Sequence, residues 1–323
     1  ESFAGGALPP AVGPGQAVRI FTGAAVPAGA DLVVIQENCE VGKGTMTIVR
    51  PFGPSRHIRK QGSDFGAGGR LLGAGRRLDP LAMVTLAAAD AAQVRVHRRP
   101  RVALIATGDE LAAPGTARNN PLTIPESVSF GIAAMVAENG GALILRRSGG
   151  DDLDALTRTA GEALGAADLV VVTGGASVGE KDFAKAMFEP HGLDLVFSKV
   201  AIKPGKPVWL GRTGDAWVLG LPGNPTSAMV TARLFLTTML AALQGRPADA
   251  LLDWTTLPLG APLAEPGDRE TFVRMAWSHG GLRPLGNQDS GVQGALSEAR
   301  WLVRRAAGAP AAVAGDLVTA LRF

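Results

Sequence analysis

The sequence predicts a multidomain α/β protein, in which a central doubly wound α/β/α sheet domain is flanked by β-rich domains. The chain has 323 residues, more than one hydrophobic core usually serves, so about two to four structural units are expected. Residues 100–247 alternate short apolar strand patterns with amphipathic helix patterns, which is typical of a mostly parallel sheet. On both sides of this region, short β-type runs are separated by Gly/Pro turns.

The N-terminal part divides into two predicted segments. Residues 1–63 are expected to form a small, partial β domain, and residues 64–99 a linker with a helical part. Asp79 and Pro80 suit the N-cap and the first position of a helix, and they precede the alanine-rich run 81–89. The strands expected in this part of the chain are 17–21, 31–37, 45–49 and 94–96.

The next two predicted segments are an α/β domain at residues 100–247 and a C-terminal β domain at residues 248–323. The helix 127–139 is expected to turn Phe130, Met135 and Val136 toward the core. The other elements expected in the α/β domain are strands 102–106, 142–145, 169–172, 193–197, 208–211 and 216–219 and helices 152–164, 183–188 and 225–243. Those in the terminal domain include strands 271–277 and 315–321.

Composition narrows the function classes. Net charge is only +3, and no Lys/Arg run carries interleaved aromatic residues, so we expect no nucleic-acid partner; anionic small ligands fit better. No apolar run is long enough to predict a membrane span. Cys39 is the single cysteine, which rules out an internal disulfide and a cysteine-based zinc site. A reducing cytoplasm is the simplest compartment.

Two glycine-containing motifs follow predicted strands of the α/β domain. Thr107-Gly108-Asp109-Glu110-Leu111 places adjacent carboxylates where a ligand or Mg²⁺ could bind, although a helix start with favourable acids is an equal alternative. Gly174-Gly175-Ala176-Ser177-Val178-Gly179-Glu180-Lys181-Asp182 is neither a Walker A loop nor a dinucleotide fingerprint. It predicts backbone amides at the edge of the sheet, and its alternative is a tight turn without a ligand.

Two further motifs belong to the same expected edge. Lys199, Lys203 and Lys206 lie in a segment stiffened by two prolines, which favours anion binding over three freely solvated lysines. Pro222-Gly223-Asn224-Pro225 separates a strand from a helix and leaves the first helical amides open. Because all four motifs follow strands of one sheet, we expect them to converge on one binding site.

These motifs together resemble the signature set of the molybdopterin molybdenumtransferase family, known as MoeA and as the E domain of gephyrin. Further resemblance lies in Arg19-Ile20-Phe21-Thr22-Gly23-Ala24-Ala25-Val26-Pro27 and Lys60-Gln61-Gly62-Ser63-Asp64, so the similarity runs from about Ser2 to the C-terminus. The resemblance implies a central domain like that of molybdopterin adenylyltransferase (MogA-like). It also implies an enzyme that inserts molybdate into adenylylated molybdopterin, with Mg²⁺ assisting and AMP released.

The resemblance also implies a homodimer, with each active site between one subunit's α/β domain and the partner's β domain. Transient contacts with molybdopterin adenylyltransferase and with molybdoenzymes would follow. The expected catalytic residues are Asp182, Glu110, Lys203 and Lys206, of which Asp182 and Glu110 would also hold the metal. The expected substrate-binding residues are Thr22, Asp64, Thr107, Gly108, Asp109, Ser127, Gly174, Gly175, Ser177, Gly179, Lys199, Pro222, Gly223, Asn224 and Pro225.

The sequence departs from the family pattern at two places. The family's Asp-Gly-Tyr-Ala motif would precede Glu1. Two interpretations are therefore open: a truncated member of the family and a divergent one. Glu126-Ser127-Val128 replaces an Asp-Ser/Thr-Asn motif, which removes an amide side chain near the expected pterin pocket. Two rival functions remain: an enzyme like molybdopterin adenylyltransferase, and a non-catalytic scaffold like the E domain of gephyrin.

Overall fold

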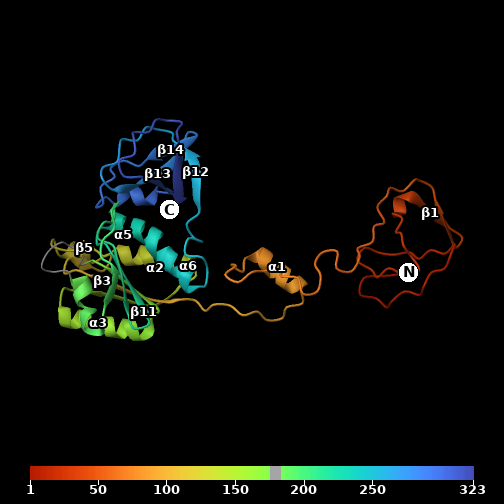
Figure 1. Cartoon of the computed structure of the whole chain (residues 1–323), viewed down its shortest axis with the longest axis horizontal. Coiled ribbons are helices and arrows are strands. Elements are labelled where there is room, and N and C mark those ends of the chain that lie inside the picture. Colours follow the sequence, from red (N-terminus) through yellow and green to blue (C-terminus); the bar gives the residue numbers. More distant parts are fainter. Residues whose placement is uncertain (175–182) are drawn as a thin grey trace. The chain divides into compact units, whose positions relative to one another are not determined.

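A computed structural model describes residues 1–174 and 183–323, which form two compact units, Glu1–Leu72 and Gly73–Phe323 (Figure 1). The four-part division predicted above is finer than this one and stays a prediction. The first unit has little regular structure: the described elements are the 3-10 turn η1 (Gln36–Asn38) and the antiparallel hairpin β1 (Cys39–Gly42) and β2 (Thr45–Ile48).

The predictions of strands at 17–21 and 31–37 in this unit are wrong. Ile20 makes only an isolated bridge to Ser2, and the segment 31–35 is irregular. The Gly/Pro turns at Ala24–Ala30 interrupt the chain before a ladder can extend. Instead, the unit is tied by its first residues, because buried Ser2 donates its N–H to Arg19 O (2.8 Å) and its hydroxyl to Ala25 O (2.8 Å).

The second unit begins with the helix α1 (Pro80–Ala88), which confirms the predicted helix start. The carboxylate of Asp79 accepts a hydrogen bond from the backbone N–H of Ala82 at 2.8 Å, so it caps the helix. This hydrogen bond holds the pKa of Asp79 below its usual value. The segment 94–96, predicted as a strand, is irregular.

The centre of this unit is a six-stranded sheet with the order β6-β3-β7-β11-β10-β8. The four strands β6, β3, β7 and β11 are parallel, whereas β10 is antiparallel to both of its neighbours. The strand bounds are β3 (Arg101–Thr107), β6 (Ala142–Gly149), β7 (Leu169–Thr173), β8 (Asp194–Phe197), β10 (Trp209–Thr213) and β11 (Ala216–Leu221). Two short strands, β4 (Leu111–Ala112) and β5 (Ile124–Pro125), pair beside it.

Helices cover both faces of the sheet, so the predicted α/β/α fold is confirmed (Figure 1). Side chains alternate along each strand: Val102 and Leu104 face one core, whereas Ala103 and Ile105 face the other. One face packs against α2 (Val128–Glu138) and against one continuous helical run. This run consists of α5 (Pro225–Thr231), the π-helix η4 (Ala232–Leu236) and α6 (Thr237–Leu243). The other packs against α3 (Leu153–Ala166) and α4 (Phe183–Ala186). The remaining short turns are η2 (Ala117–Asn119) and η3 (Glu189–His191).

Two helices differ in detail from expectation. Phe130, predicted to face the core, is 44% exposed, and the guanidinium of Arg146 lies over its ring, 3.8 Å from the centroid. The helical run Pro225–Leu243 has the length and apolar composition of a membrane span, although no apolar run that long was expected. Over half of that run is buried, and Leu236 and Leu240 lie fully inside the core of the unit.

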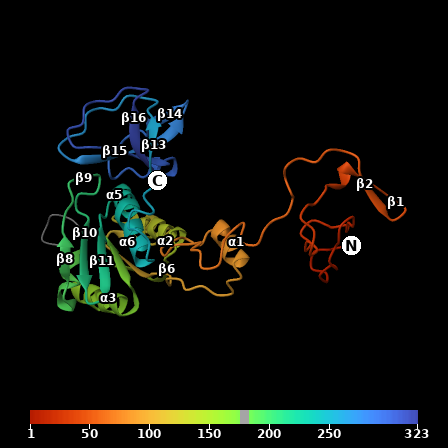
Figure 2. The same ribbon diagram turned by 45° about the vertical axis from the view of Figure 1, so that its right-hand side comes forward.

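The C-terminal part forms a second sheet, with the order β12-β16-β15-β13-β14 (Figure 2). One strand of this sheet comes from the α/β domain: β9 (Ile202–Lys203) pairs in parallel with the start of β13. The bounds are β12 (Trp254–Pro258), β13 (Glu270–Ser278), β14 (Gly281–Pro284), β15 (Trp301–Arg305) and β16 (Leu317–Arg322), with the 3-10 turn η5 (Gly294–Ser297). The predicted β runs at 271–277 and 315–321 are therefore confirmed.

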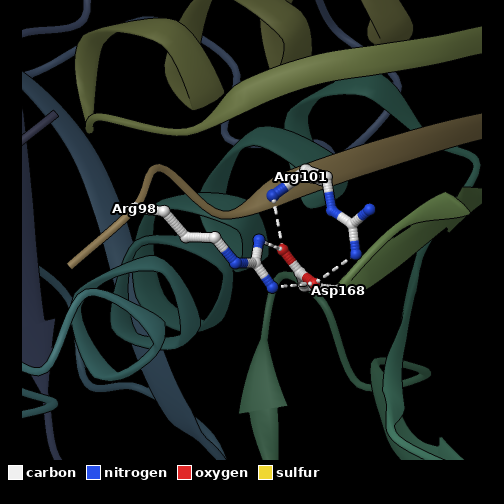
Figure 3. Close-up of polar contacts among 3 residues, drawn as sticks. All are labelled: Arg98, Arg101 and Asp168. Carbon is white, nitrogen blue, oxygen red and sulfur yellow. Dashed lines mark hydrogen bonds and ion pairs between the residues drawn. The ribbon is translucent and has the colours of Figure 1, made fainter.

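Asp168 joins the starts of three parallel strands. Its carboxylate pairs with the guanidinium groups of Arg98 and Arg101 (Figure 3) and accepts the backbone N–H of Arg101 at 2.8 Å. Its own N–H donates to Arg101 O (2.8 Å), and its carbonyl accepts from Trp217 N (3.0 Å). The hydrogen bonds from Arg98, followed by those from Arg101, hold the pKa of this carboxyl well below its usual range, although partial burial opposes the shift.

We expect Asp168→Asn to lower the free energy of unfolding by about 2 kcal/mol at pH 7, because hydrogen bonds to a charged group are lost. A carboxyl with a depressed pKa stabilises the fold above its unfolded pKa of about 3.9 and loses that contribution as pH falls further. The difference in the free energy of unfolding between parent and variant should therefore shrink below about pH 4. Urea unfolding across pH measures it. Asp215→Asn, whose carboxylate is exposed, is the control; equal loss in both variants would contradict the assignment.

Candidate active site

The strand register brings three of the sequence motifs, and the segment after β6, to one edge of the central sheet. Thr173 at the end of β7 pairs with Ala106 on one side and with Leu221 on the other. Thr107 at the end of β3 is level with Gly149 at the end of β6. The segments that begin at Gly108, Gly150, Gly174 and Pro222 therefore leave the sheet side by side, at the edge where open α/β sheets bind ligands.

Glycines allow the backbones to approach closely at the centre of this edge. Gly174 has φ +96°, and a side-chain carbon there would collide with the carbonyl oxygen of Thr107. A carbon on Gly223 would lie 3.4 Å from the Cα of Gly174. Thr107, Gly174 and Gly223 thus form a tight backbone cradle, in which main-chain groups rather than side chains would meet a ligand.

The two acids after β3 have different surroundings. The Asp109 carboxylate accepts a hydrogen bond from the backbone N–H of Asp151 at 2.8 Å, so it fastens the segment after β6. Glu110 folds back toward Gly108, where an added side-chain carbon would lie 2.5 Å from its Oε2. Its exposed carboxylate makes no hydrogen bond or ion pair with any residue in 1–174 or 183–323. Glu110 is therefore the acid that is open to a ligand.

The structure shows what each residue of the triplet Glu126-Ser127-Val128 contacts. The buried Glu126 carboxylate accepts the backbone N–H of Ser129 at 2.8 Å and also its hydroxyl, so it caps the start of α2. Val128 is buried in the core between α2 and the sheet. Only Ser127 is exposed, which leaves it as the one member of the triplet that faces outward.

The C-terminal domain of the same chain contributes a loop to this edge, which the sequence analysis missed. Asn224 donates to the hydroxyl of Ser290 (3.1 Å), and the Ser127 hydroxyl donates to Gln293 Oε1 (3.2 Å). Thr226 donates to Val292 O at 2.8 Å. The polar run 287–293 lies between two terminal strands, and its Gly/Asn/Asp content was the available signal of a functional loop.

Two side chains hold this loop against β13. Gln288 accepts the backbone N–H of Arg274 (3.0 Å) through its amide oxygen and donates to Leu285 O (2.6 Å). Arg274 is fully buried and donates through Nη2 to the carbonyl of Asp289 at 3.2 Å. Burial lowers the pKa of Arg274, and the negative charge of Asp289 opposes that shift. The loop is thus fixed from the terminal sheet before it reaches α2 and α5.

The lysine segment lies toward the far end of the same edge. It begins two residues after the end of β8, a strand that lies roughly 19 Å, or four strand spacings, from β3. Lys199 and Lys206 line one hollow, whereas Lys203 is outside its lining. All three lysines are exposed, and among the described residues none is a hydrogen-bond or ion-pair partner of their ammonium groups. A side-chain carbon on Gly205 would collide with Thr231, so the turn between Lys203 and Lys206 lies against α5.

Several predicted site residues cannot be related to this edge. Gly175, Ser177, Gly179 and Asp182 lie in 175–182, outside the described residues. Thr22, in a turn, and Asp64 are exposed residues of the first unit. Within 1–174 and 183–323, no group of three His, Cys, Asp or Glu side chains is placed to hold a metal ion.

Known proteins match this chain along most of its length. Residues 103–242 match the probable molybdopterin binding domain, and residues 2–89 match the MoeA N-terminal region, domains I and II. The molybdopterin molybdenumtransferase of Staphylococcus aureus (strain N315) is 31% identical over 317 residues, which cover 95% of this chain and 74% of that protein. The chain belongs to the molybdopterin molybdenumtransferase family.

Other relatives agree with this assignment. The molybdopterin molybdenumtransferases of Nostoc sp. and Haemophilus influenzae are 35% and 37% identical over 80% and 76% of this chain. The chain spans about three fifths of their length, 60% and 61%. The solved molybdopterin biosynthesis MoeA protein of Pyrococcus horikoshii has a TM-score of 0.81 and 28% identity, covering 100% of this chain and 79% of its own.

The glycine cradle generates a stability prediction. We expect Gly174→Ala to lower the free energy of unfolding by about 2 kcal/mol or more, because it combines a strained φ with a backbone collision. Gly165→Ala is the matched control: Gly165 lies in α3, where an added carbon meets nothing within 4 Å. That variant should gain about 0.5–1 kcal/mol. Chemical denaturation measures both, and a tolerated alanine at 174 would contradict the cradle.

Proposed function

We propose that the chain transfers molybdenum from molybdate to molybdopterin, using adenylylated molybdopterin as substrate and releasing AMP. The observation that carries this proposal is the glycine cradle at the ends of β3, β7 and β11, with the open Glu110 carboxylate after β3 and three exposed lysines after β8 of the same sheet. The family assignment and the match to a molybdopterin binding domain support the pterin as the ligand class.

The dimensions of the edge suit an extended, polyanionic substrate. The cradle formed by Thr107, Gly174 and Gly223 offers main-chain groups to a flat or phosphorylated ligand. Lys199, Lys203 and Lys206 follow β8, a strand that lies roughly three strand spacings, or 14 Å, from the cradle strand β7. A substrate as long as adenylylated molybdopterin can span such a distance, and the cleavage of its phosphoanhydride requires neutralisation of developing negative charge. Lysines supply that charge without covalent chemistry.

Mg²⁺ is the expected assisting ion. It usually binds through one or two carboxylates together with waters and substrate phosphates, so it needs no cage of three acids. The exposed Glu110 carboxylate fits this requirement, and Asp182 is the proposed second ligand. When bound, the ion would neutralise phosphate charge as the anhydride breaks. Asp109, whose oxygen already accepts the Asp151 N–H, would hold the segment after β6 in place.

We further propose a homodimer working in the cytoplasm, with Thr22 and Asp64 reaching the partner's site. Both residues are exposed in their unit, as this role requires. Transient contacts with the preceding adenylyltransferase and with recipient molybdoenzymes would deliver substrate and accept product. The first unit matches the MoeA N-terminal region, which favours a molybdenumtransferase over an adenylyltransferase-like enzyme.

The proposed function is tested by turnover. The purified full chain, given adenylylated molybdopterin, molybdate and Mg²⁺, should release AMP and form a product that activates a molybdenum-dependent apoenzyme. AMP is quantified by chromatography. A preparation that binds the pterin but never releases AMP would favour the scaffold function instead.

The metal assignment predicts a specific shift. Glu110→Gln should raise the Mg²⁺ concentration for half-maximal AMP release about tenfold or more, because one charged ligand is lost. Glu162→Gln, an exposed acid on α3, is the matched control and should leave the Mg²⁺ response unchanged. An unaltered response in Glu110→Gln would remove Glu110 from the metal site.

A further inference from the structure

The strand β6 forms one outer edge of the central sheet, and β8 forms the opposite edge (Figure 2). Within residues 1–174 and 183–323, β3 is the only strand that pairs with β6, so the other side of its backbone is open to pairing. β6 has eight residues, whereas β8 has four. The exposed residues of β6 are Leu143, Ile144, Arg146, Arg147 and Ser148. β6 is therefore the longer open edge of this sheet.

Apolar side chains are exposed along this edge. Leu143 and Ile144 are 37% and 42% exposed, although strands of parallel sheets are usually covered on both faces. Phe130, on the neighbouring helix α2, is 44% exposed. Covering these three side chains would remove apolar surface from water, which stabilises a complex. The exposed apolar residues thus favour a partner at this edge.

Two arginines give the edge a positive charge. The guanidinium of Arg146 lies over the ring of Phe130, so its side chain is held between β6 and α2. The guanidinium of Arg147 donates one long hydrogen bond of 3.5 Å, to the carbonyl oxygen of Arg146. Neither guanidinium pairs with a carboxylate in the part of the chain that the structure describes. Both charges are therefore available to acidic groups of a partner.

The edge leads to the candidate active site. Gly149, the last residue of β6, is level with Thr107 at the end of β3. The segment that follows β6 is fastened by Asp109, whose carboxylate accepts the N–H of Asp151. A partner that lies along β6 would therefore reach the edge of the sheet at which the candidate site is found.

The same strand is poorly suited to pairing with a second copy of itself. The pairing of β6 with β3 shifts register between Leu143 and Leu145, which leaves Ile144 as an extra residue. Such a bulge bends a strand and disrupts regular pairing at an edge. Two copies of β6 edge to edge would also bring four arginine side chains together, and like charges across a strand pair are destabilising. An acidic strand has no such repulsion, so the charge selects against self-pairing.

We propose that β6 is a docking strand for a partner protein, which adds an extended segment to the central sheet. Consecutive side chains of a strand point to opposite faces, so the added segment carries one acidic side chain for Arg146 and one for Arg147. Its apolar side chains cover Leu143, Ile144 and Phe130. In this binding mode, main-chain hydrogen bonds supply affinity and side chains supply selectivity. The docking strand does not depend on the reaction proposed above.

The experiment uses three fluorescein-labelled peptides with the length of β6, rich in valine and threonine. They differ only at two adjacent central positions, which are both glutamate, both glutamine or both lysine. Fluorescence anisotropy with the full chain measures their binding at low and moderate salt. The glutamate peptide should bind about tenfold or more tightly than the glutamine peptide, the gain expected for a charge-assisted hydrogen bond. Added salt should weaken its binding, and the lysine peptide should bind most weakly.

Variants of Arg147 test the charge of the docking strand. Arg147→Glu should weaken binding of the glutamate peptide about tenfold or more and strengthen binding of the lysine peptide. Arg147→Gln, which removes the charge without reversing it, should fall between the parent and Arg147→Glu. Arg158→Glu, at an exposed arginine on α3, is the matched control and should bind all three peptides like the parent.

Hydrogen exchange identifies what covers the strand. Amides of residues 142–149 should exchange more slowly when the glutamate peptide is added to the parent, but not when it is added to Arg147→Glu. Protection of these amides that rises with the concentration of the chain alone would assign the edge to a second copy and overturn the proposal. Absence of glutamate-peptide binding, or equal binding to parent and Arg147→Glu, would also overturn it. A chain that binds this peptide but releases no AMP would refute only the proposed function.

Discussion

One residue, Asp168, ties together the starts of three of the four parallel strands of the central sheet. Asp168 meets the start of β3 through Arg101 and the start of β11 through its own carbonyl. Parallel ladders tolerate slippage unless something fixes their ends, since each buried strand here is apolar on both faces. Five residues later the strands end level with one another, and this alignment brings Thr107, Gly174 and Pro222 to a common edge.

The candidate site is formed as much by main chain as by side chains. At its centre, the absence of side-chain carbons lets the ends of β3, β7 and β11 touch. The exposed acid Glu110 follows β3, and three exposed lysines follow β8 of the same sheet. The loop 287–293 adds hydroxyl and amide groups from the terminal domain, fixed by the buried Arg274 and by Gln288.

Local signals in the sequence predicted local structure well. Strand and helix patterns located the central fold, the cap at Asp79 and the strand ends that carry the motifs, because each depends on neighbouring residues. Resemblance identified the family. The loop 287–293 was missed because its hydrogen bonds reach segments that are 66 and 166 residues away in the sequence. The strands wrongly predicted in the first unit had suitable residues but lacked a partner strand.

The pairing of β9 with β13 means that the α/β domain and the terminal domain are not independent modules. A boundary at residue 247 looks natural in the sequence, yet a cut there would leave an exposed strand edge on each fragment. Such edges invite pairing with other chains. During synthesis, the lysine segment emerges long before β13 exists, so it waits without its strand partner until the terminal sheet is translated. The lysine segment therefore gains its strand partner only when the terminal sheet forms.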